Sequence, residues 1–574
     1  MADRRFRLVV ASACVLVFVP VLVLAALASG CATQPAGEGE ASKPGEAKGY
    51  AVEEKTAADL AADMAAGRVS SEELVRIYLE RIETIDRSGP TLRSVLAVNP
   101  RALDDAKALD AERARGAVRG PLHGIPVLVK DNIESADPLP TTAGSLALAE
   151  NTTGRDAPIV ERLRKAGAVI LGKTNLSEWA NIRSSRSTSG WSAIGGLTRN
   201  PYAVDRNSCG SSSGSGAAIA ANLGALSIGT ETDGSITCPA AVNGIVGLKP
   251  TVGLLSRRHI VPISHTQDTA GPMTRTVADA ALMLSVMAGT DPADSATAKA
   301  DEHVTDYVAA LSSGPGLSGA KLGVLRFAAG YLPALDATFD HALDELRGAG
   351  ATIVEIEAFP GLGPINRDEL DVLLTELKAD LEAYLADAPP AVKARTLEEL
   401  IAFNERETAR EMRFFGQELF EQAAKTKGLD AAEYRKKVAS NLRLAGPEGI
   451  DRLLREHGVD ALIAPTTGPA WTTDVVNGDH YLGSATTLAA VAGYPHLTVP
   501  MGHVFGLPVG LSFIGPAWSE ARLLALGHAF EQRTRARVPP TFAPAIDRFE
   551  EVAAGLVSAQ QPAVAEAKPQ AQPH

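Results

Sequence analysis

The pattern of hydrophobic and polar positions along the chain predicts helices with defined starts. Thr56-x-x-Asp59 and Ser70-x-x-Glu73 have the spacing of helix N-caps, and apolar side chains recur at helical spacing between residues 74 and 82. The same helical pattern returns further along the chain. It covers residues 157–165 and 337–346.

Short apolar runs lie between these helical segments and predict strands. Strands that alternate with helices pack into a sheet that helices cover on both faces, so the pattern predicts an α/β fold. Residues 361–446 are charged and mostly helical in pattern, and we expect them to decorate the sheet. The predicted strands are residues 125–129, 168–171, 322–325, 351–356, 461–464 and 508–514.

The first thirty residues have the layout of an export signal. Three arginines precede an apolar run from residue 8 to 27, which small residues and Cys31 follow. This layout resembles a bacterial lipoprotein signal, which implies a signal peptide over residues 1–30 and lipidation of Cys31. An uncleaved anchor is the alternative, because the run is long enough to span a bilayer although Pro20 interrupts it. We expect an exported protein, either a membrane-tethered lipoprotein or a periplasmic protein, that meets the membrane only through this lipid or anchor.

Polar segments flank the rest of the chain. Residues 31–49 read as a solvated tether and residues 550–574 as a disordered polar tail, which leaves residues 50–549 as the folded body. The composition, 45% hydrophobic and 21% charged, excludes disorder throughout. The net charge, 55 − 68 = −13, speaks against a nucleic-acid partner. At ~150 residues per domain the length would suggest three or four domains.

Cysteine and histidine usage gives little support to a metal site. No CxxC and no HExxH motif occurs among four cysteines and 11 histidines, so we predict no metal. If Cys31 is lipidated and Cys14 belongs to the signal, Cys209 and Cys238 remain in the body. They could pair in an oxidising compartment, but two free buried thiols are the favoured interpretation, because free cysteine is often buried.

Lys130 ends an apolar strand in the segment 123–132 and is a candidate base. Removal from water at such a position can lower the pKa of an amine toward neutrality, and a neutral amine can accept a proton. Strand alternation sends Asp131 to the opposite face, which leaves the amine unpaired. A strand-end lysine is more often solvated, so this segment by itself is weak evidence.

A Gly/Ser-rich segment, 209–216, opens directly into an Ala-rich helix predicted over 217–226. Its composition is also that of a flexible linker, but a spacer would not lead straight into an apolar helix. Gly210-x-Ser212-x-Gly214 matches the nucleophile elbow, which requires a preceding strand; residues 199–207 form none, so we reject that match.

A third segment places Gly234 immediately before Ser235. Such a glycine lets successive backbone N–H groups converge on one point, as stabilisation of an oxyanion requires. A tight structural turn is an equally good interpretation of this fragment alone.

Together the three segments resemble the amidase signature family, whose hydrolases carry a Ser-cisSer-Lys triad. The family pattern is G-[IV]-P-x-x-x-K-D, then a GGSSGG-like loop, then T-D-x-G-G-S-I, with 24 residues between the two serines. Here 235 − 211 = 24. The match places Lys130 as the base, Ser211 as the bridging serine and Ser235 as the nucleophile. It also implies a cis peptide bond before Ser211.

The resemblance continues through four further segments and covers essentially the whole body. It implies a single large mixed β-sheet covered by helices on both faces, no cofactor and a monomeric enzyme. The further matching segments are 171–175, 198–201, 268–275 and 506–510. The resemblance implies an oxyanion hole from the backbone N–H groups of Thr232, Asp233, Gly234 and Ser235, and a substrate pocket that includes Ser212, Thr237 and Asn175.

Departures from the pattern bear on the substrate. Many family members carry Arg where this chain has Thr237, so a substrate with a free carboxylate there, such as the glutamyl group handled by the tRNA-dependent amidotransferase, is disfavoured. The triple serine 211–213, Cys238, Glu231 and the segment 411–418 resemble bacterial peptide amidases. We therefore expect hydrolysis of C-terminal peptide amides to the acid and ammonia.

Three alternatives remain. A hydrolase with the same triad could act on esters, aryl amides, small amides or lactams. A non-catalytic member of a transamidation assembly would have a protein partner instead. Ser318-x-x-Lys321 is the only candidate motif for a penicillin-binding enzyme, and no Lys-Thr-Gly accompanies it.

Overall fold

The computed structural model describes residues 49–556. The predicted signal peptide, most of the tether and Cys31 lie outside the described residues. Between residues 49 and 556, no helix combines the length and hydrophobicity that a membrane span requires.

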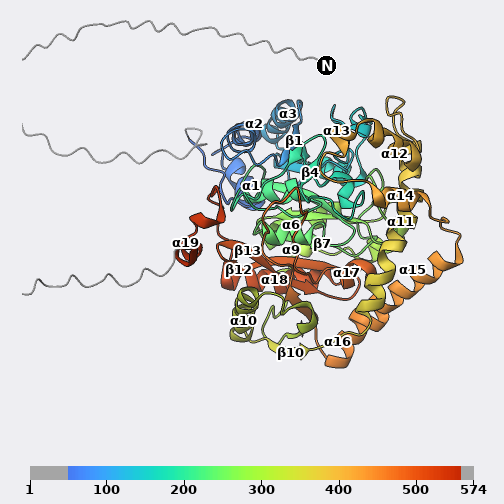
Figure 1. Cartoon of the computed structure of the whole chain (residues 1–574). Helices are drawn as coiled ribbons and strands as arrows, with labels where there is room; N and C mark the ends of the chain where they lie inside the picture. The colour runs from blue at the N-terminus through green and yellow to red at the C-terminus, as the bar shows by residue number, and fades with distance from the viewer. Residues whose placement is uncertain (1–48, 557–574) are drawn as a thin grey trace, which may run out of the picture. The chain divides into compact units, whose positions relative to one another are not determined.

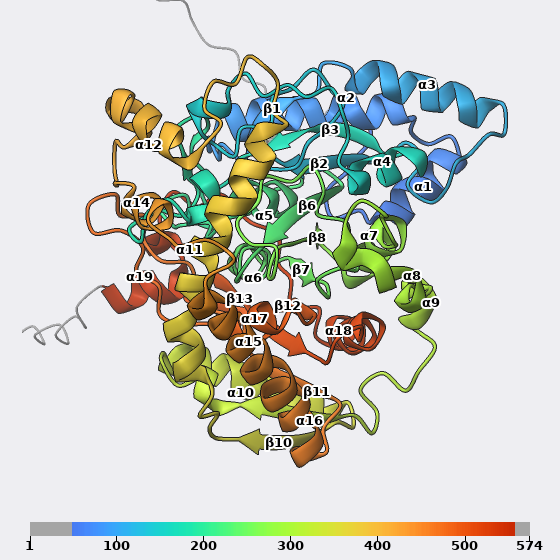
Figure 2. The same cartoon turned by 90° about the vertical axis from the view of Figure 1, so that its right-hand side faces the viewer.

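Eleven strands of the described chain form one sheet (Figure 1). They are β1 (Val95–Val98), β2 (Pro126–Lys130), β3 (Val169–Thr174), β6 (Leu226–Glu231), β7 (Val246–Lys249), β8 (Thr269–Thr274), β9 (Lys321–Leu325), β10 (Thr352–Ile356), β11 (Ala461–Pro465), β12 (His496–Val504) and β13 (Leu507–Ile514). Their order in the sheet is β1-β3-β2-β6-β8-β7-β12-β13-β11-β9-β10, and Figure 2 shows the sheet with β1 near the top and β10 at the bottom. A separate hairpin joins β4 (Trp191–Ser192) and β5 (Gly196–Leu197).

The sheet is mixed, as the family resemblance predicted. Strand β2 pairs in parallel with both β3 and β6, whereas β6 pairs antiparallel with β8. All six strands predicted from apolar runs are present, as β2, β3, β9, β10, β11 and β13. Strands β2, β3 and β6 are buried along their whole length, which explains their continuous apolar character.

Helices cover both faces of the sheet (Figure 2). Helices α3, α7, α10, α18, α5 and α6 contact its strands directly. The helices are α1 (Ala57–Ala65), α2 (Ser71–Arg81), α3 (Ala102–Ala114), α4 (Pro158–Lys165), α5 (Ser213–Ala220), α6 (Thr237–Val242), α7 (Val277–Met287), α8 (Ala300–His303), α9 (Tyr307–Ala310), α10 (Pro333–Gly348), α11 (Leu362–Ala386), α12 (Leu397–Arg406), α13 (Thr408–Glu411), α14 (Glu418–Ala424), α15 (Ala432–Ala445), α16 (Asp451–His457), α17 (Thr487–Ala492), α18 (Glu520–Thr534) and α19 (Glu550–Leu556).

Local sequence signals explain where several helices begin. Thr56 caps α1 in a reciprocal capping box with Asp59, and Ser70 caps α2 by accepting from the backbone N–H of Glu73. Helices α4 and α10 include the predicted segments 157–165 and 337–346 almost entirely. Capping residues therefore located the starts of α1 and α2, and the helical pattern located α4 and α10.

Two boundaries differ from the sequence prediction. The helix predicted over 217–226 ends at Ala220, because Asn222 adopts a left-handed conformation (φ 56°) and Leu226 begins β6. The first residues of the segment predicted to be a disordered tail, 550–556, form α19.

Residues 361–446 form the predicted helical decoration. Helices α11 to α15 come from this segment, and α11 packs against α14 and α15. Leucines of α11 and α12 share an apolar cluster with Phe420 and Trp179, so the decoration has a core of its own beside the sheet.

Candidate active site

Strand β2 ends in Lys130, whose side chain is fully buried. Its Nζ lies 2.8 Å from Ser211 Oγ and 2.8 Å from Thr230 Oγ1. Burial disfavours the charged form and lowers the pKa of Lys130 to about 7, although the carboxylates of Asp268 and Glu231 act in the opposite direction. A large fraction of Lys130 is therefore neutral near pH 7 and able to accept a proton.

The neighbouring carboxyl group turns away from this amine. Asp131 accepts a hydrogen bond from Thr142, and its Oδ1 lies 3.8 Å from Lys173 Nζ. The alternation of side chains along β2 thus separates Lys130 from Asp131, as the sequence predicted.

The Gly/Ser-rich segment brings Ser211 to the lysine. The Gly210–Ser211 peptide bond is cis, as the family resemblance implied. The Ser211 side chain is fully buried against Lys130, and α5 begins two residues later. The backbone N–H of Ser212 donates to the Ser235 carbonyl oxygen over 3.1 Å, so this segment lies directly against the Ser235 loop.

Ser235 follows β6 in a short turn before α6. Gly234 has a φ of 77°, a left-handed conformation that glycine adopts without strain. Glu231 Oε2 accepts from the backbone N–H groups of Ile236 (2.7 Å) and Thr237 (2.9 Å). This buried carboxylate therefore holds the end of β6 and the start of α6 together around Ser235.

Three residues predicted for the substrate pocket make structural contacts instead. Ser212 Oγ donates to the Thr230 carbonyl oxygen (3.0 Å), Thr237 Oγ1 to Glu231 Oε2 (3.2 Å), and Asn175 Nδ2 to Thr198 Oγ1 (3.0 Å). All three side chains are fully buried. The structure does not bring them to the cavity at the serines.

A disulfide joins the two serine loops. Cys209 and Cys238 are bonded, with 6.1 Å between their Cα atoms. The favoured interpretation as two free buried thiols is therefore wrong. The two cysteines lie two residues before Ser211 and three residues after Ser235, so once the loops meet at one site the sulfur atoms come within bonding distance. This proximity depends on the tertiary structure. The signal in the sequence that could have indicated it is the 24-residue gap between the serines, which implied that the two loops meet at one site.

A cavity of about 320 Å³ borders the residues that precede the two serines, Gly210 and Gly234. Most of its wall comes from segments without a recognisable motif, and the sequence analysis missed them. The other lining residues are Asn181, Ser189, Cys209, Asp233, Cys238, Trp471, Asp479, Tyr481, Ser484, Thr486 and Thr487.

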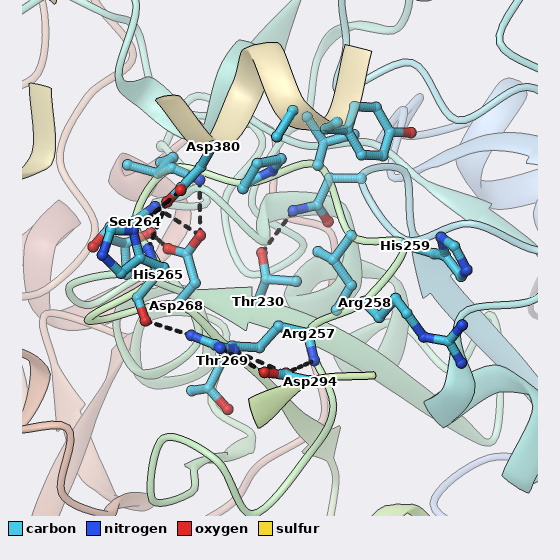
Figure 3. Close-up of a pocket in the computed structure, with 18 of the residues that line it drawn as sticks. Thr230, Arg257, Arg258, His259, Ser264, His265, Asp268, Thr269, Asp294 and Asp380 are labelled. Atoms are coloured by element: carbon cyan, nitrogen blue, oxygen red, sulfur yellow. Dashed lines mark hydrogen bonds and ion pairs between the residues drawn. The ribbon is translucent and has the colours of Figure 1, made fainter. Parts of the chain in front are cut away.

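A larger cavity, of about 530 Å³, lies elsewhere along the loop that contains Arg257 to Thr269 (Figure 3). It reaches Thr230 and Thr232, and neither Ser211 nor Ser235 is among the residues that line either cavity. Arg257 is held there by Asp294, with 2.6 Å between Nη2 and Oδ1. Because this cavity borders neither serine loop at Gly210 or Gly234, the smaller one is the better candidate for the substrate.

One group of potential metal ligands occurs in the part of the chain that the structure describes. Donor atoms of His265, Glu376 and Asp380 lie within 4.8 Å of one another. His265 Nδ1 lies 2.9 Å from Asp380 Oδ2, a hydrogen bond that raises the pKa of His265, and Tyr434 donates to Glu376 over 2.7 Å. These contacts account for the cluster as a hydrogen-bonded group, and we assign it no metal.

The family model described as Amidase matches residues 73–524. The chain therefore belongs to the amidase signature family, as its motifs predicted, and it is an amidase, an enzyme that hydrolyses amide bonds.

Particular relatives cover most of the chain. The solved native peptide amidase of Stenotrophomonas maltophilia is 52% identical, with a TM-score of 0.80, over 85% of this chain and 99% of that one. A probable amidase of Arabidopsis thaliana is 39% identical over 515 residues, 88% of this chain and 94% of the relative. A glutamyl-tRNA(Gln) amidotransferase subunit from Pseudomonas aeruginosa is 36% identical over 492 residues, 83% of this chain and 96% of the relative.

Proposed function

We propose that this amidase hydrolyses the terminal carboxamide of C-terminally amidated peptides, with release of ammonia, through an acyl-enzyme on Ser235. The observation that carries the proposal is the 2.8 Å contact between Ser211 Oγ and a buried Lys130 whose pKa is lowered to about 7. A neutral lysine against a serine hydroxyl is the arrangement that activates a serine nucleophile without histidine.

In the proposed relay, the amine of Lys130 accepts one proton and later returns it. As Ser235 Oγ attacks the carbonyl carbon, it passes its proton to Ser211, which passes its own to Lys130. The proton returns by the same route to the leaving nitrogen, so ammonia departs as the C–N bond breaks and an ester remains on Ser235. Water then gives a proton to the same relay, attacks the ester and frees the peptide carboxylate.

The proposed oxyanion hole consists of backbone N–H groups of the loop from Thr232 to Ser235. The left-handed Gly234 lets consecutive N–H groups turn toward one point, and the Glu231 carboxylate fixes the end of the loop. Such donors act on the tetrahedral intermediate without having to reorganise.

The proposed substrate rests on the similarity of this chain to a peptide amidase and on the charges that line the cavity at the serines. The solved peptide amidase is 52% identical to this chain over 85% of its length. Among the described residues, no cationic side chain lines the cavity at the serines, and Thr237 lies where many family members carry arginine. A substrate carboxylate would therefore lack a partner at this site.

Similarity to one relative supports a second candidate function. Similarity to the glutamyl-tRNA(Gln) amidotransferase subunit, at 36% identity, supports a non-catalytic member of a transamidation assembly as the alternative. Hydrolysis of aryl amides, small amides or lactams by the same triad is a narrower alternative.

Ammonia release tests these proposals. The purified chain is incubated with amidated dipeptides, acetanilide, small aliphatic amides, a lactam and glutamine, and ammonia and carboxylate are measured. We expect the amidated dipeptides to be hydrolysed with the highest kcat/KM. Ser235→Ala, Ser211→Ala and Lys130→Ala should each lower kcat by about 10⁴-fold or more.

Covalent labelling distinguishes an inactive chain from an active enzyme whose substrate is missing from the panel. A fluorophosphonate probe should attach to Ser235 in the parent chain and fail to attach in Ser235→Ala. Absence of both ammonia release and labelling would overturn the hydrolase mechanism and favour a transamidation role.

We also propose that the enzyme acts outside the cytoplasm. The signal-like pattern that ends at Cys31 supports this, and a disulfide such as Cys209–Cys238 persists in oxidising compartments. Radiolabelled palmitate incorporation that depends on Cys31 would support the lipoprotein form. Recovery of the full-length chain in the cytosolic fraction would contradict export.

A further inference from the structure

The cavity at the two serine loops is lined by two acidic side chains and, among the described residues, by no cationic one. Its lining residues include Asp233 and Asp479 and no lysine, arginine or histidine. Asp233 lies two residues before Ser235, at the position where the family pattern has glycine. The carboxylate is thus an addition to the loop that carries the nucleophile.

Asp233 accepts a hydrogen bond from a neutral donor at the cavity wall. Thr487 Oγ1 donates to Asp233 Oδ2 over 2.8 Å. Glu369, from α11, shares a hydrogen bond with the same carboxylate, and burial together with the charge of Asp233 raises the pKa of Glu369 to about 8. Glu369 is therefore mostly protonated at neutral pH. Burial also raises the pKa of Asp233, while hydrogen bonds from its neighbours and the charge of Lys249 act in the opposite direction.

Asp479 is held by neutral donors as well. Its carboxylate accepts from the backbone N–H of Ser189 (3.0 Å) and from Trp471 Nε1 (3.1 Å). Burial raises the pKa of Asp479, and these hydrogen bonds act against the rise. Neither donor brings a positive charge to Asp479. Lys249, whose charge acts on Asp233, does not line the cavity.

This charge opposes the chemistry unless the substrate offsets it. A carboxylate beside the nucleophile disfavours the negative charge that develops on the carbonyl oxygen, whereas a bound cation cancels that effect. The cavity also has an aromatic wall, in which Trp471 and Tyr481 meet edge to face with 5.6 Å between ring centroids. Aromatic faces bind ammonium groups favourably.

We infer that the cavity selects amides whose acyl part carries an ammonium group near the scissile bond. The inference rests on the proposed function and narrows its substrate class. Two sources supply this chemistry: the free α-amino group of a short peptide amide, and the side chain of a lysine at its C-terminus. Consecutive Cα atoms are ~3.8 Å apart, so the α-amino group of a dipeptide amide lies one residue away from the reacting carbonyl. The lysine ammonium lies at the end of the side chain of the reacting residue itself.

Three amides with side chains of similar length separate these sources. N-acetyl-norleucinamide carries no charge, norleucinamide carries an α-ammonium, and Nα-acetyl-lysinamide carries a side-chain ammonium. We measure kcat/KM for ammonia release by the parent chain, and the affinity of each amide for Ser235→Ala by calorimetry. We expect at least one cationic amide to exceed the neutral amide by about tenfold or more, as for a hydrogen bond to a charged group.

Variants of the two carboxylates test the cause of the preference. Asp479→Asn removes the charge and keeps one oxygen, for either Ser189 or Trp471. Asp233→Asn removes the charge at the nucleophile loop. We compare the ratio of cationic to neutral substrate within each variant, because a general loss of activity cancels in that ratio. The ratio should fall toward one in both. Asp474→Asn, in the same segment as Asp479 but outside the cavity wall, should leave it unchanged.

Each result decides the inference. A ratio near one in the parent chain overturns it, as does a ratio that neither Asp479→Asn nor Asp233→Asn lowers. If neither these three amides nor the broader panel of amides is hydrolysed, the proposed function fails, and the affinities for Ser235→Ala decide the charge preference on their own. Equal affinity for all three amides would then overturn it.

Discussion

At the scale of single residues, the environment of Lys130 sets the conditions under which the proposed chemistry can run. Its amine is fully buried and contacts two hydroxyl groups, Ser211 Oγ and Thr230 Oγ1. Removal from water costs the charged form more than the neutral form, which is why the pKa of Lys130 lies far below that of a solvated lysine. The same amine in solution would be almost fully protonated at pH 7.

Activity is expected to fall with acid because only neutral Lys130 can accept a proton. Its pKa is lowered to about 7, so the neutral fraction rises with pH up to that value and then levels off. The kcat/KM of the parent chain should therefore drop about tenfold per pH unit below pH 7. A pH–rate profile with an amidated dipeptide measures this limb.

Substitution of a nearby carboxylate, Asp268, provides the control for this pH dependence. The charge of Asp268 favours protonated Lys130, so Asp268→Asn should move the acidic limb to lower pH. An acidic limb that keeps its position in Asp268→Asn, or a profile without any limb between pH 5 and 8, would contradict the assignment of Lys130 as the base.

At the scale of elements, β2, β6 and α5 place the three catalytic candidates. Strands β2 and β6 are parallel neighbours, so the ends that carry Lys130 and the Ser235 loop lie at the same edge of the sheet. Helix α5 packs against both strands and brings Ser211 between them. The geometry of the site thus depends on how closely α5 approaches the sheet.

Gly214, in α5, should be intolerant of any side chain. A Cβ there would lie 2.3 Å from the Ser94 carbonyl oxygen and 2.5 Å from that of Asn175, both of which are backbone atoms. Gly214→Ala should lower the free energy of unfolding by about 1–3 kcal/mol and reduce kcat, because α5 has to shift. Denaturant unfolding and ammonia release measure the two effects.

Gly363 provides a matched helical control. A Cβ at this position of α11 meets nothing within 4 Å. Gly363→Ala should leave activity unchanged and stabilise the chain by about 0.5–1 kcal/mol, since alanine is the better helix former. Equal effects of the two substitutions would show that α5 is not closely packed.

The Cys209–Cys238 bond should stabilise the fold by restricting the unfolded chain. It closes a loop with a sequence separation of 29 residues, for which chain entropy predicts about 3–4 kcal/mol. The double variant Cys209→Ser/Cys238→Ser should therefore unfold at lower denaturant concentration than the parent, and its kcat should fall because the two serine loops are no longer tied. A reducing agent should destabilise the parent and leave the double variant unaffected.

At the scale of the whole molecule, one buried arginine connects the sheet region to the helical decoration. Arg183 is fully buried, and its guanidinium donates to the carbonyl oxygens of Glu411 (2.8 Å) and Gly416 (3.1 Å). Its Nε lies 2.9 Å from Glu178 Oε1, and the group stacks on Phe415 at 4.3 Å. Arg183 thus holds the segment 411–418, which resembles bacterial peptide amidases in sequence, through hydrogen bonds to its backbone.

Removal of this arginine should destabilise the whole chain. Arg183→Met leaves Glu178 buried without its partner and several carbonyl groups without a donor, which should cost about 3–5 kcal/mol. Thermal unfolding followed by circular dichroism measures the loss. Arg186→Met, at an exposed position of the same segment, should change stability by less than about 0.5 kcal/mol. Comparable losses in both variants would contradict the anchoring role.

Much of this molecule could be predicted from its sequence because the relevant signals are local. Apolar runs located six strands, capping residues located the starts of α1 and α2, and fixed spacing related Ser211 to Ser235. The length-based expectation of three or four domains did not anticipate that one eleven-stranded sheet spans most of the described chain. Strands such as β6 were missed because small residues and glycine hide their apolar pattern.

What only the tertiary structure decided is the set of contacts between segments far apart in the chain. The pairing of Cys209 with Cys238, the structural rather than pocket positions of Ser212, Thr237 and Asn175, and the cavity wall from Trp471 to Thr487 all depend on how loops meet. The sequence by itself indicated Lys130 as a candidate base, since removal from water lowers the pKa of an amine, but only the structure showed that this side chain is fully buried. The sequence could not determine which carboxylates would face the substrate, because electrostatic neighbourhood is a property of distance in space and not of order along the chain.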